Sequence, residues 1–326
     1  MDLDWLREYV SRSGIFRDDA LLSFVGRGES NINYLVQDKN TQLILRAARN
    51  DVPHNPRFEN EHHFLRFVEH LGINFAPKSV FYDADNQIHA ISYIPGKDAS
   101  CLDLDKKQQG LFFEQLSIVE HVRYEEYVEW CKAEKIDPRR SVSYKDTWQK
   151  YLDKIAYINQ SKRDRFSDLA LRWILERTEF VDKKKPDSEP VTSFKHGDLR
   201  WNNGSGNIRI SPQMVAFIDW ELAGFNYGYS FDFVDMLGTI PNTRETKEAR
   251  KDLISFYNSS REYAIDPQLI VYGLLMENIG TVIWAAHRYC YLVNTKQMGK
   301  ERYRERALHL MEESEIFYRR PFAEWF

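Results

Sequence analysis

Residues 195–203 read Lys-His-Gly-Asp-Leu-Arg-Trp-Asn-Asn, and residues 217–221 read Phe-Ile-Asp-Trp-Glu. Each polar segment follows a short apolar run of the kind that forms a β-strand. Asp198, Asn203 and Asp219 supply hard oxygen ligands and a candidate base, the combination that magnesium and phosphoryl transfer require. Any one of the three alone fits a capping or turn residue equally well. Together they predict a site for phosphoryl chemistry.

A glycine-containing loop lies upstream, between strand candidates at 21–25 and 33–37. Its small and polar positions are Gly26, Gly28, Ser30 and Asn31. A dinucleotide-binding fingerprint requires a following helix and a third glycine where Asn31 stands, so that interpretation fails. Because glycine lacks a Cβ, backbone N–H groups in such a hairpin can approach phosphates closely. Taken alone, the loop fits an ordinary hairpin turn better.

The order of elements predicts an α+β protein with two lobes, consistent with a length of 326 residues. Residues 1–96 contain strand candidates at 21–25, 33–37, 42–47, 78–82 and 88–94 and a helical period at 58–71. Residues 97–326 are mostly helical, with a few short strands. We therefore expect a small antiparallel N-lobe over residues 1–96 and a larger helical C-lobe over residues 97–326.

Composition excludes several classes of protein. A formal net charge of −4 does not indicate a nucleic-acid partner. The chain has three cysteines and no CxxC pair, which fits a reducing compartment, and its first residues do not resemble a signal peptide. The apolar stretch 267–286 contains Glu277 and many small or polar residues, so a buried core helix is favoured over a membrane span. We therefore expect a cytoplasmic protein without a membrane partner.

The sequence resembles the aminoglycoside phosphotransferase and choline kinase-like superfamily, small-molecule kinases related in fold to protein kinases. The segment His196-Gly197-Asp198-Leu199 with Asn203 is similar to the family's catalytic loop, and Ile218-Asp219-Trp220-Glu221 is similar to its metal-binding segment. The resemblance extends from about residue 24 to 237 and is weakest over the helical insert at 100–190 and the C-terminal helices. It implies a protein-kinase-like fold, ATP and Mg²⁺ as cofactors, and a small-molecule hydroxyl group as phosphate acceptor.

The resemblance also implies roles for individual residues. Asp198 would accept or orient the hydroxyl proton, while Asn203 and Asp219 would hold magnesium. The loop residues that would cover the ATP phosphates are Gly26, Gly28, Ser30 and Asn31. The backbone of Ser92 and Ile94 would form the hinge and bind adenine. His196 would brace the catalytic loop, and Asp232 would hold that loop in place.

One position departs from the pattern of protein kinases and many relatives. They place a lysine on the third strand, paired with a glutamate on the next helix, whereas this chain has Arg46. Glu61 is the expected partner and Glu59 the second choice. Arginine keeps the charge but is not interchangeable with lysine, so a catalytically weak nucleotide-binding protein on the same fold stays open as an alternative. A protein kinase is disfavoured, because the HRD, DFG and APE triplets are absent.

The acceptor itself is not named by the sequence. An acidic and aromatic cluster around 124–130 suits a cation such as choline or an amino sugar, although aromatic residues at helical spacing are more often core residues. The acceptor candidates are Glu221, Tyr124, Tyr127, Trp130, Trp284 and His287. The oligomeric state is left open.

Overall fold

A computed structural model of the chain describes residues 3–14, 20–28, 31–49, 57–100, 103–186, 191–199, 207–228, 232–238, 244–259 and 265–319. Its contacts divide the chain into two compact units that interleave in sequence. Unit 1 comprises Met1–Phe112, His196–Asp198 and Asn203–Ala223, and unit 2 comprises Phe113–Lys195, Leu199–Asn202 and Gly224–Phe326.

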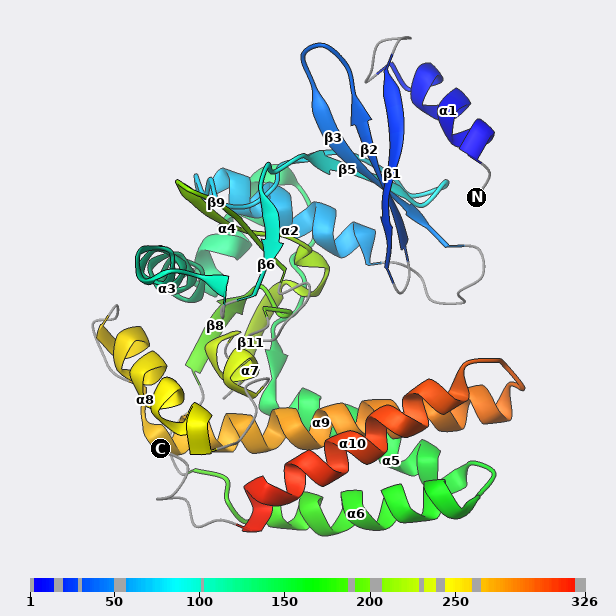
Figure 1. The fold of residues 1–326 in the computed structure, drawn as a ribbon, viewed down its shortest axis with the longest axis vertical. Helices are drawn as coiled ribbons and strands as arrows, with labels where there is room; N and C mark the ends of the chain where they lie inside the picture. Colours follow the sequence, from blue (N-terminus) through cyan, green and yellow to red (C-terminus); the bar gives the residue numbers. More distant parts are fainter. Residues whose placement is uncertain are drawn as a thin grey trace. The chain divides into compact units, whose positions relative to one another are not determined.

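Unit 1 contains a five-stranded antiparallel sheet in the order β1-β2-β3-β5-β4 (Figure 1). The strands are β1 (Leu21–Arg27), β2 (Asn31–Gln37), β3 (Gln42–Ala48), β4 (Ser79–Asp83) and β5 (Ile88–Ser92). Side chains alternate between the two faces of a strand, so Val36 and Leu45 share one apolar face. Helix α1 (Leu3–Arg12) packs on that face through Leu6 and Val10.

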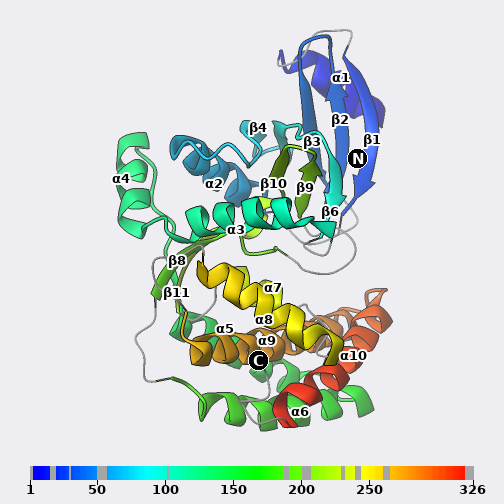
Figure 2. The same ribbon diagram turned by 60° about the vertical axis from the view of Figure 1, so that its left-hand side comes forward.

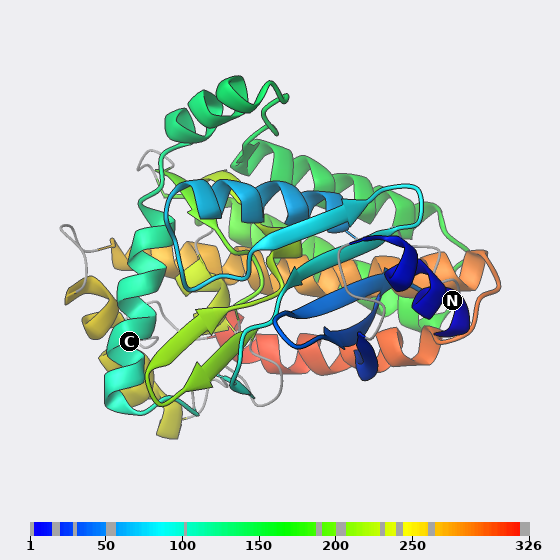
Figure 3. The same ribbon diagram turned by 90° about the horizontal axis from the view of Figure 1, so that it is seen from above.

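Helix α2 (Phe58–His70) packs beside β4 and β5 (Figure 3). Its buried residues recur with a helical period: Phe58, Glu61, Phe64, Leu65, Phe67 and Val68. Glu61 is the one charged member of this buried stripe. It therefore requires a charged or hydrogen-bonding partner from a neighbouring element.

A second sheet of unit 1 has the order β10-β9-β6, in which β6 (Lys97–Ala99), β9 (Ile208–Ser211) and β10 (Met214–Phe217) pair antiparallel (Figure 2). These pairings place β6, which follows residue 96, in the same unit as the first sheet. The contacts thus divide the chain differently from the boundary at residue 96 drawn from the sequence. The assignment of nucleotide-binding and acceptor-binding roles to residues 1–96 and 97–326 stays a prediction.

Unit 2 is mostly helical. Helix α3 (Lys106–Glu120) crosses from unit 1 into unit 2. The further helices are α4 (Tyr124–Glu134), α5 (Tyr144–Gln160), α6 (Arg165–Asp182), α7 (Asp232–Gly238), α8 (Arg244–Ser259), α9 (Pro267–Asn294) and α10 (Lys300–Arg319). A small sheet in the order β7-β11-β8 joins β7 (Val142–Ser143), β11 (Gly224–Gly228) and β8 (Val191–Lys195).

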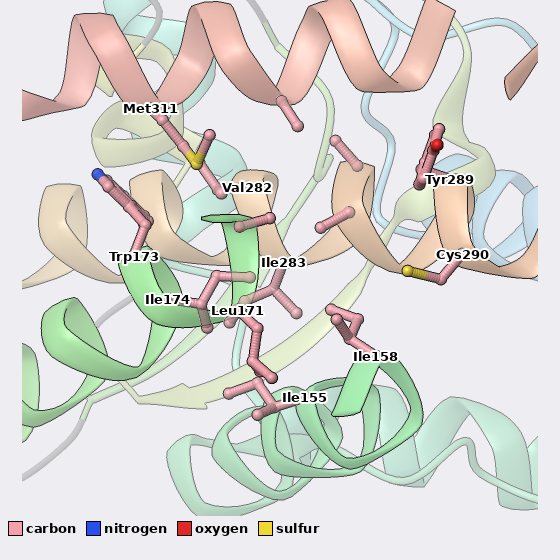
Figure 4. Close-up of a cluster of buried hydrophobic side chains, with 14 of the residues drawn as sticks. Ile155, Ile158, Leu171, Trp173, Ile174, Val282, Ile283, Tyr289, Cys290 and Met311 are labelled. Carbon is pink, nitrogen blue, oxygen red and sulfur yellow. The ribbon is translucent and has the colours of Figure 1, made fainter. Parts of the chain in front are cut away.

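Helix α9 is the central helix of unit 2. Its Val282, Ile283 and Tyr289 pack into a core with residues of α5, α6 and α10 (Figure 4). Among the described residues, α9 is the one helix long and apolar enough to cross a membrane. Its most apolar 18-residue stretch is 72% buried inside the structure. The burial agrees with the expectation of a core helix for this stretch.

Candidate active site

Arg46 of β3 stands at the centre of a buried ion network in unit 1. Its Nη1 lies 2.5 Å from both carboxylate oxygens of Glu61, and its Nη2 lies 2.6 Å from Oδ1 of Asp219 and 3.4 Å from Oε2 of Glu221. Burial alone would lower the pKa of Arg46, but the three carboxylates raise it. The side chain is therefore a permanent cation, and Glu61 is the partner that the sequence suggested first.

Glu61 is fully buried, so its charge depends on its neighbours. Burial alone would raise the pKa of this carboxyl group, but Arg46 and then His89 hold it well below its usual range. Glu221 behaves in the opposite way, because burial and the neighbouring charge of Asp219 raise its pKa to about 7. The network therefore combines one firmly ionised carboxylate with one that takes up a proton near neutrality.

Asp219 follows β10 and has an unusual backbone conformation. Its φ of 68° and ψ of 57° lie in the left-handed region, which few residues other than glycine adopt. The short 3₁₀ turn η2 (Trp220–Leu222) begins next, and the buried Trp220 indole donates a hydrogen bond to the carbonyl of Phe217 at 2.8 Å. This turn sets the direction in which Asp219 leaves the strand.

His196 joins the two polar segments that decided the sequence interpretation. Its Nε2–H donates to the carbonyl of Ile218 at 2.9 Å, and its Nδ1 accepts from the backbone N–H of Asp198 at 3.3 Å. Burial lowers the pKa of His196, which fits this neutral tautomer. These contacts hold the loop of Asp198 against the residue that precedes Asp219.

Gly197 allows the same two loops to touch. Its φ is +88°, and a Cβ at this position would lie 2.5 Å from the carbonyl oxygen of Leu222. Only glycine fits both the left-handed backbone and the close approach. Glycine at position 197 is thus required by the packing of η2.

Asn207 is a site residue that the sequence interpretation missed. Its side-chain amide donates to the backbone carbonyl of Asp198 at 2.8 Å and to Oδ2 of the same residue at 2.9 Å. Its own carbonyl accepts from the N–H of Ile218 at 2.9 Å. Its position directly before the apolar alternation of β9 was an available signal, but Asn203 matched the motif spacing and took precedence.

Other nucleotide-site candidates lie on the first sheet and its loops. Gly28 donates its N–H to the carbonyl of the buried Asn31 at 2.9 Å, and Gly26 lies in β1. Ser92 ends β5, and Ile94 follows it in the connection to β6. Ser30 and Asn203 lie outside the described residues, so their predicted roles stay predictions.

The proposed acceptor residues of α4 belong to a packed core within unit 2. Tyr127 and Trp130 are buried, and Tyr127 and Tyr124 both contact the ring of Phe225. The Tyr127 hydroxyl accepts from the backbone N–H of Arg139 at 2.8 Å. These contacts are those of core residues, and we base no acceptor proposal on them.

The acceptor candidates on α9 are half-buried. Trp284 contacts the ring of Tyr303, with centroids 5.5 Å apart, and His287 contacts Tyr157 at 4.8 Å. Burial, followed by the charges of Lys154 and Arg288, lowers the pKa of His287. Both side chains therefore have aromatic surroundings in unit 2, and their role toward an acceptor stays a prediction.

An acidic cluster of unit 2 surrounds Lys195, the last residue of β8. Its Nζ lies 3.2 Å from Oδ2 of Asp235. Burial alone would lower the pKa of Lys195, but Asp235, Asp232 and Glu277 raise it. Asp232 itself is buried at the first residue of α7. Its predicted contact with the catalytic loop stays a prediction.

Comparison with known proteins identifies the family. The chain matches the model of the phosphotransferase enzyme family over residues 22–264. The chain belongs to this family. A search of curated proteins found no match. Family membership makes the protein a phosphotransferase that acts on a hydroxyl group, as the sequence predicted.

Solved structures of low sequence identity share the fold. A Plasmodium vivax ethanolamine kinase is similar with a TM-score of 0.66 at 15% identity, covering 94% of this chain and 87% of that one. The choline kinase LicA of Streptococcus pneumoniae has a TM-score of 0.61 at 16% identity, covering 95% and 98%. A spectinomycin phosphotransferase, solved with ADP and spectinomycin, has a TM-score of 0.65 at 13% identity, covering 98% and 99%. The kinase-like α+β fold is confirmed.

Proposed function

We propose that this phosphotransferase uses ATP and Mg²⁺ to transfer the γ-phosphoryl group to a hydroxyl group of a small amine-bearing acceptor. The observation that carries the proposal is the linkage of Asp198 to Asp219 within unit 1. His196 and Asn207 each contact both the Asp198 residue and the backbone of Ile218. The same unit contains Arg46, which binds Asp219 directly.

Two buried polar atoms support a nucleotide in this unit. Asn33 and Arg46 are neighbours in register across β2 and β3. Within the described residues, Oδ1 of Asn33 and Nε of Arg46 are buried without a hydrogen-bond partner. A polar ligand is expected where buried polar atoms are left unpaired. Arg46 Nε is a donor suited to a phosphate oxygen.

Magnesium fits the donor chemistry of the segment after β10. Among the described residues no group of three or more His, Cys, Asp or Glu side chains is arranged to hold a metal ion. The proposed ligands are the two residues implied by the family resemblance, the carboxylate of Asp219 and the amide oxygen of Asn203, completed by phosphate oxygens and water, as magnesium prefers. When bound, the ion would neutralise the negative charge of the phosphates.

The protein's own side chains then perform the remaining steps. Asp198 accepts the proton of the acceptor hydroxyl as the hydroxyl oxygen bonds to the γ-phosphorus, while the bond from that phosphorus to the bridging oxygen breaks and ADP leaves. The Asn207 amide donates to Oδ2 of Asp198, which fixes the orientation of the carboxylate. Arg46 stays charged because of its carboxylate partners and binds phosphate oxygens. Positioning and charge compensation of this kind supply most of the rate acceleration in phosphoryl transfer.

The preference for an amine-bearing acceptor is supported by two observations. The similar structures include kinases named for ethanolamine, choline and an aminocyclitol antibiotic, spectinomycin. In unit 2, the charges of Asp235, Asp232 and Glu277 act on the ammonium of Lys195, and Oδ2 of Asp235 lies 3.2 Å from it. In the sequence, Lys195 stands three residues before Asp198.

The test is a coupled assay of ADP release with purified protein, ATP and Mg²⁺ against matched acceptor pairs, such as ethanolamine with ethylene glycol. We expect turnover with amino alcohols or aminoglycosides and at least about 10-fold lower kcat/KM for the neutral partner. Asp219→Asn serves as the inactive control. Nucleotide binding without turnover on a broad acceptor panel would favour a catalytically weak binding protein instead.

A further inference from the structure

A buried histidine lies directly behind the Arg46–Glu61 pair. His89 of β5 is opposite Arg46 in the sheet register and is fully buried. Its Nδ1 lies 3.1 Å from Oε2 of Glu61, so it is the second partner of that carboxylate. The rings of Phe58 and Tyr82 lie 6.0 and 6.2 Å from the ring of His89. None of the functions proposed above uses this residue.

The hydrogen bonds of His89 continue through a serine to a second histidine. Nε2 of His89 lies 2.8 Å from Oγ of Ser79, and this Oγ lies 2.7 Å from Nδ1 of His62. An ionised carboxylate only accepts hydrogen bonds, so His89 Nδ1–H donates to Glu61. Ser79 and His62 complete the chain, because a hydroxyl both donates and accepts and can turn its proton either way.

This series of hydrogen bonds begins and ends on helix α2. Glu61 and His62 are consecutive residues of α2, while Ser79 and His89 belong to β4 and β5. Two adjacent side chains of one helix are thus fixed to two different strands. A shift of α2 along the sheet would break both attachments together. Such a shift would also move the Glu61 carboxylate away from Arg46.

We propose that His62, Ser79 and His89 are positioning residues that clamp α2 to the sheet and so hold the Glu61 carboxylate under Arg46. This inference rests on the proposed function, because the purpose of the clamp is to orient Arg46 for the nucleotide. With Nη1 held by Glu61, Nη2 contacts Asp219 and Nε has no partner among the described residues. The clamp acts through Glu61 and does not itself touch the reacting groups.

Substitutions at His89 separate its hydrogen bond from its packing. Asparagine places an amide donor near the position of Nδ1, whereas leucine fills space without a donor. We expect His89→Leu to raise KM for ATP about 10-fold, and His89→Asn to stay within about 2-fold of the wild type. Ser79→Ala should raise KM for ATP about 3-fold. KM for the acceptor should be unchanged in all three, while a merely structural defect would lower the active fraction and leave both KM values intact.

Hydrogen exchange of α2 backbone amides tests the clamp without any nucleotide. We expect exchange in α2 to accelerate about 10-fold in Ser79→Ala and His89→Leu. It should not accelerate in Ser13→Ala, a control that removes a local serine hydroxyl bond at the end of α1. The proposal would be overturned if α2 exchange were unchanged in folded His89→Leu protein. It would also be overturned if His89→Asn and His89→Leu raised KM for ATP equally. If the wild type does not bind ATP, the proposed function fails, and the exchange data alone decide on the clamp.

Discussion

The side-chain amide of Asn207 contacts Asp198 twice, at the backbone carbonyl and at the carboxylate, although nine residues of sequence separate them. The family motif directs attention to Asn203, whereas the described contacts belong to Asn207. Both asparagines can be tested, and they are expected to behave differently.

Asn207→Ala removes both hydrogen bonds to Asp198. We expect kcat to fall about 10-fold or more, because the carboxylate loses its orientation, and the free energy of unfolding to fall by about 1–2 kcal/mol. Asn203→Ala should instead raise the Mg²⁺ concentration needed for half-maximal activity. Steady-state kinetics across a Mg²⁺ titration distinguishes the two. The reverse pattern would assign the metal position to Asn207.

Asp198→Asn removes the proposed base and keeps the shape of the side chain. The kcat value should fall roughly 10²–10⁴-fold, as for loss of a typical general base. Binding of an ATP analogue, measured by the rise in melting temperature, should be retained. Wild-type turnover in the purified variant would remove Asp198 from the mechanism.

Arg46 can be tested by two substitutions of different severity. Arg46→Met leaves Glu61 buried without its cationic partner, which should cost about 3–5 kcal/mol of stability. Arg46→Lys keeps the charge, but one ammonium group cannot reproduce the contacts that Nη1 and Nη2 make with Glu61 and Asp219. We expect this variant to fold and to show about a 10-fold higher KM for ATP. Arg66→Lys, on the exposed side of α2, is the control.

Gly197 and Gly72 form a matched pair for a stability test. Both have positive φ, +88° and +73°, but a Cβ would collide with a backbone oxygen at Gly197 and would meet nothing within 4 Å at Gly72. Gly72→Ala should cost about 1 kcal/mol from the backbone alone. Gly197→Ala should cost roughly 2–4 kcal/mol, because overpacking adds to that strain. Urea unfolding midpoints of both variants check this, and equal losses would contradict the close approach to Leu222.

His62 predicts an acid-dependent loss of stability. Burial, followed by the charges of His89 and Arg66, lowers the pKa of His62 from 6.5 to about 4. Between these values the unfolded chain binds the proton and the folded chain does not, so stability falls as the pH falls. Because the ring is half-buried, we expect only roughly 1–2 kcal/mol.

The variant that tests this pH dependence of stability is His62→Asn, which keeps a hydrogen-bond donor near the position of Nδ1 but does not titrate. From pH 6.5 down to pH 4, the wild type should lose more free energy of unfolding than the variant. His70→Gln, exposed at the end of α2, should follow the wild type. Parallel curves for the wild type and His62→Asn would refute the shift.

Much of unit 1 is predictable from its residues. The alternation in β2 and β3 and the helical period of α2 give these elements because each buries one face locally. The three-residue β6 was missed, since its partner β9 lies more than 100 residues away, and the four-residue β9 was missed although it pairs with the adjacent β10. The motif residues Asp198 and Asp219 lie in loops that His196 and Asn207 link.

The remaining site residues follow from tertiary contacts alone. His89 carries no motif, and its importance comes from the register that places it beside Arg46 and from the helix that brings Glu61 to it. Burial, too, follows from tertiary contacts. The acidic and aromatic surroundings of Tyr127 and Trp130 suggested a cation site, whereas the structure buries both side chains, and their role toward an acceptor stays a prediction.

The unit that contains Asp198 and Asp219 is not a continuous piece of chain, since 113–195 leaves it and His196–Asp198 returns. The intervening helices can therefore accumulate substitutions or change length while the carboxylates keep the partners that orient them. A fragment ending at residue 112, by contrast, would retain Arg46 and Glu61 but neither aspartate.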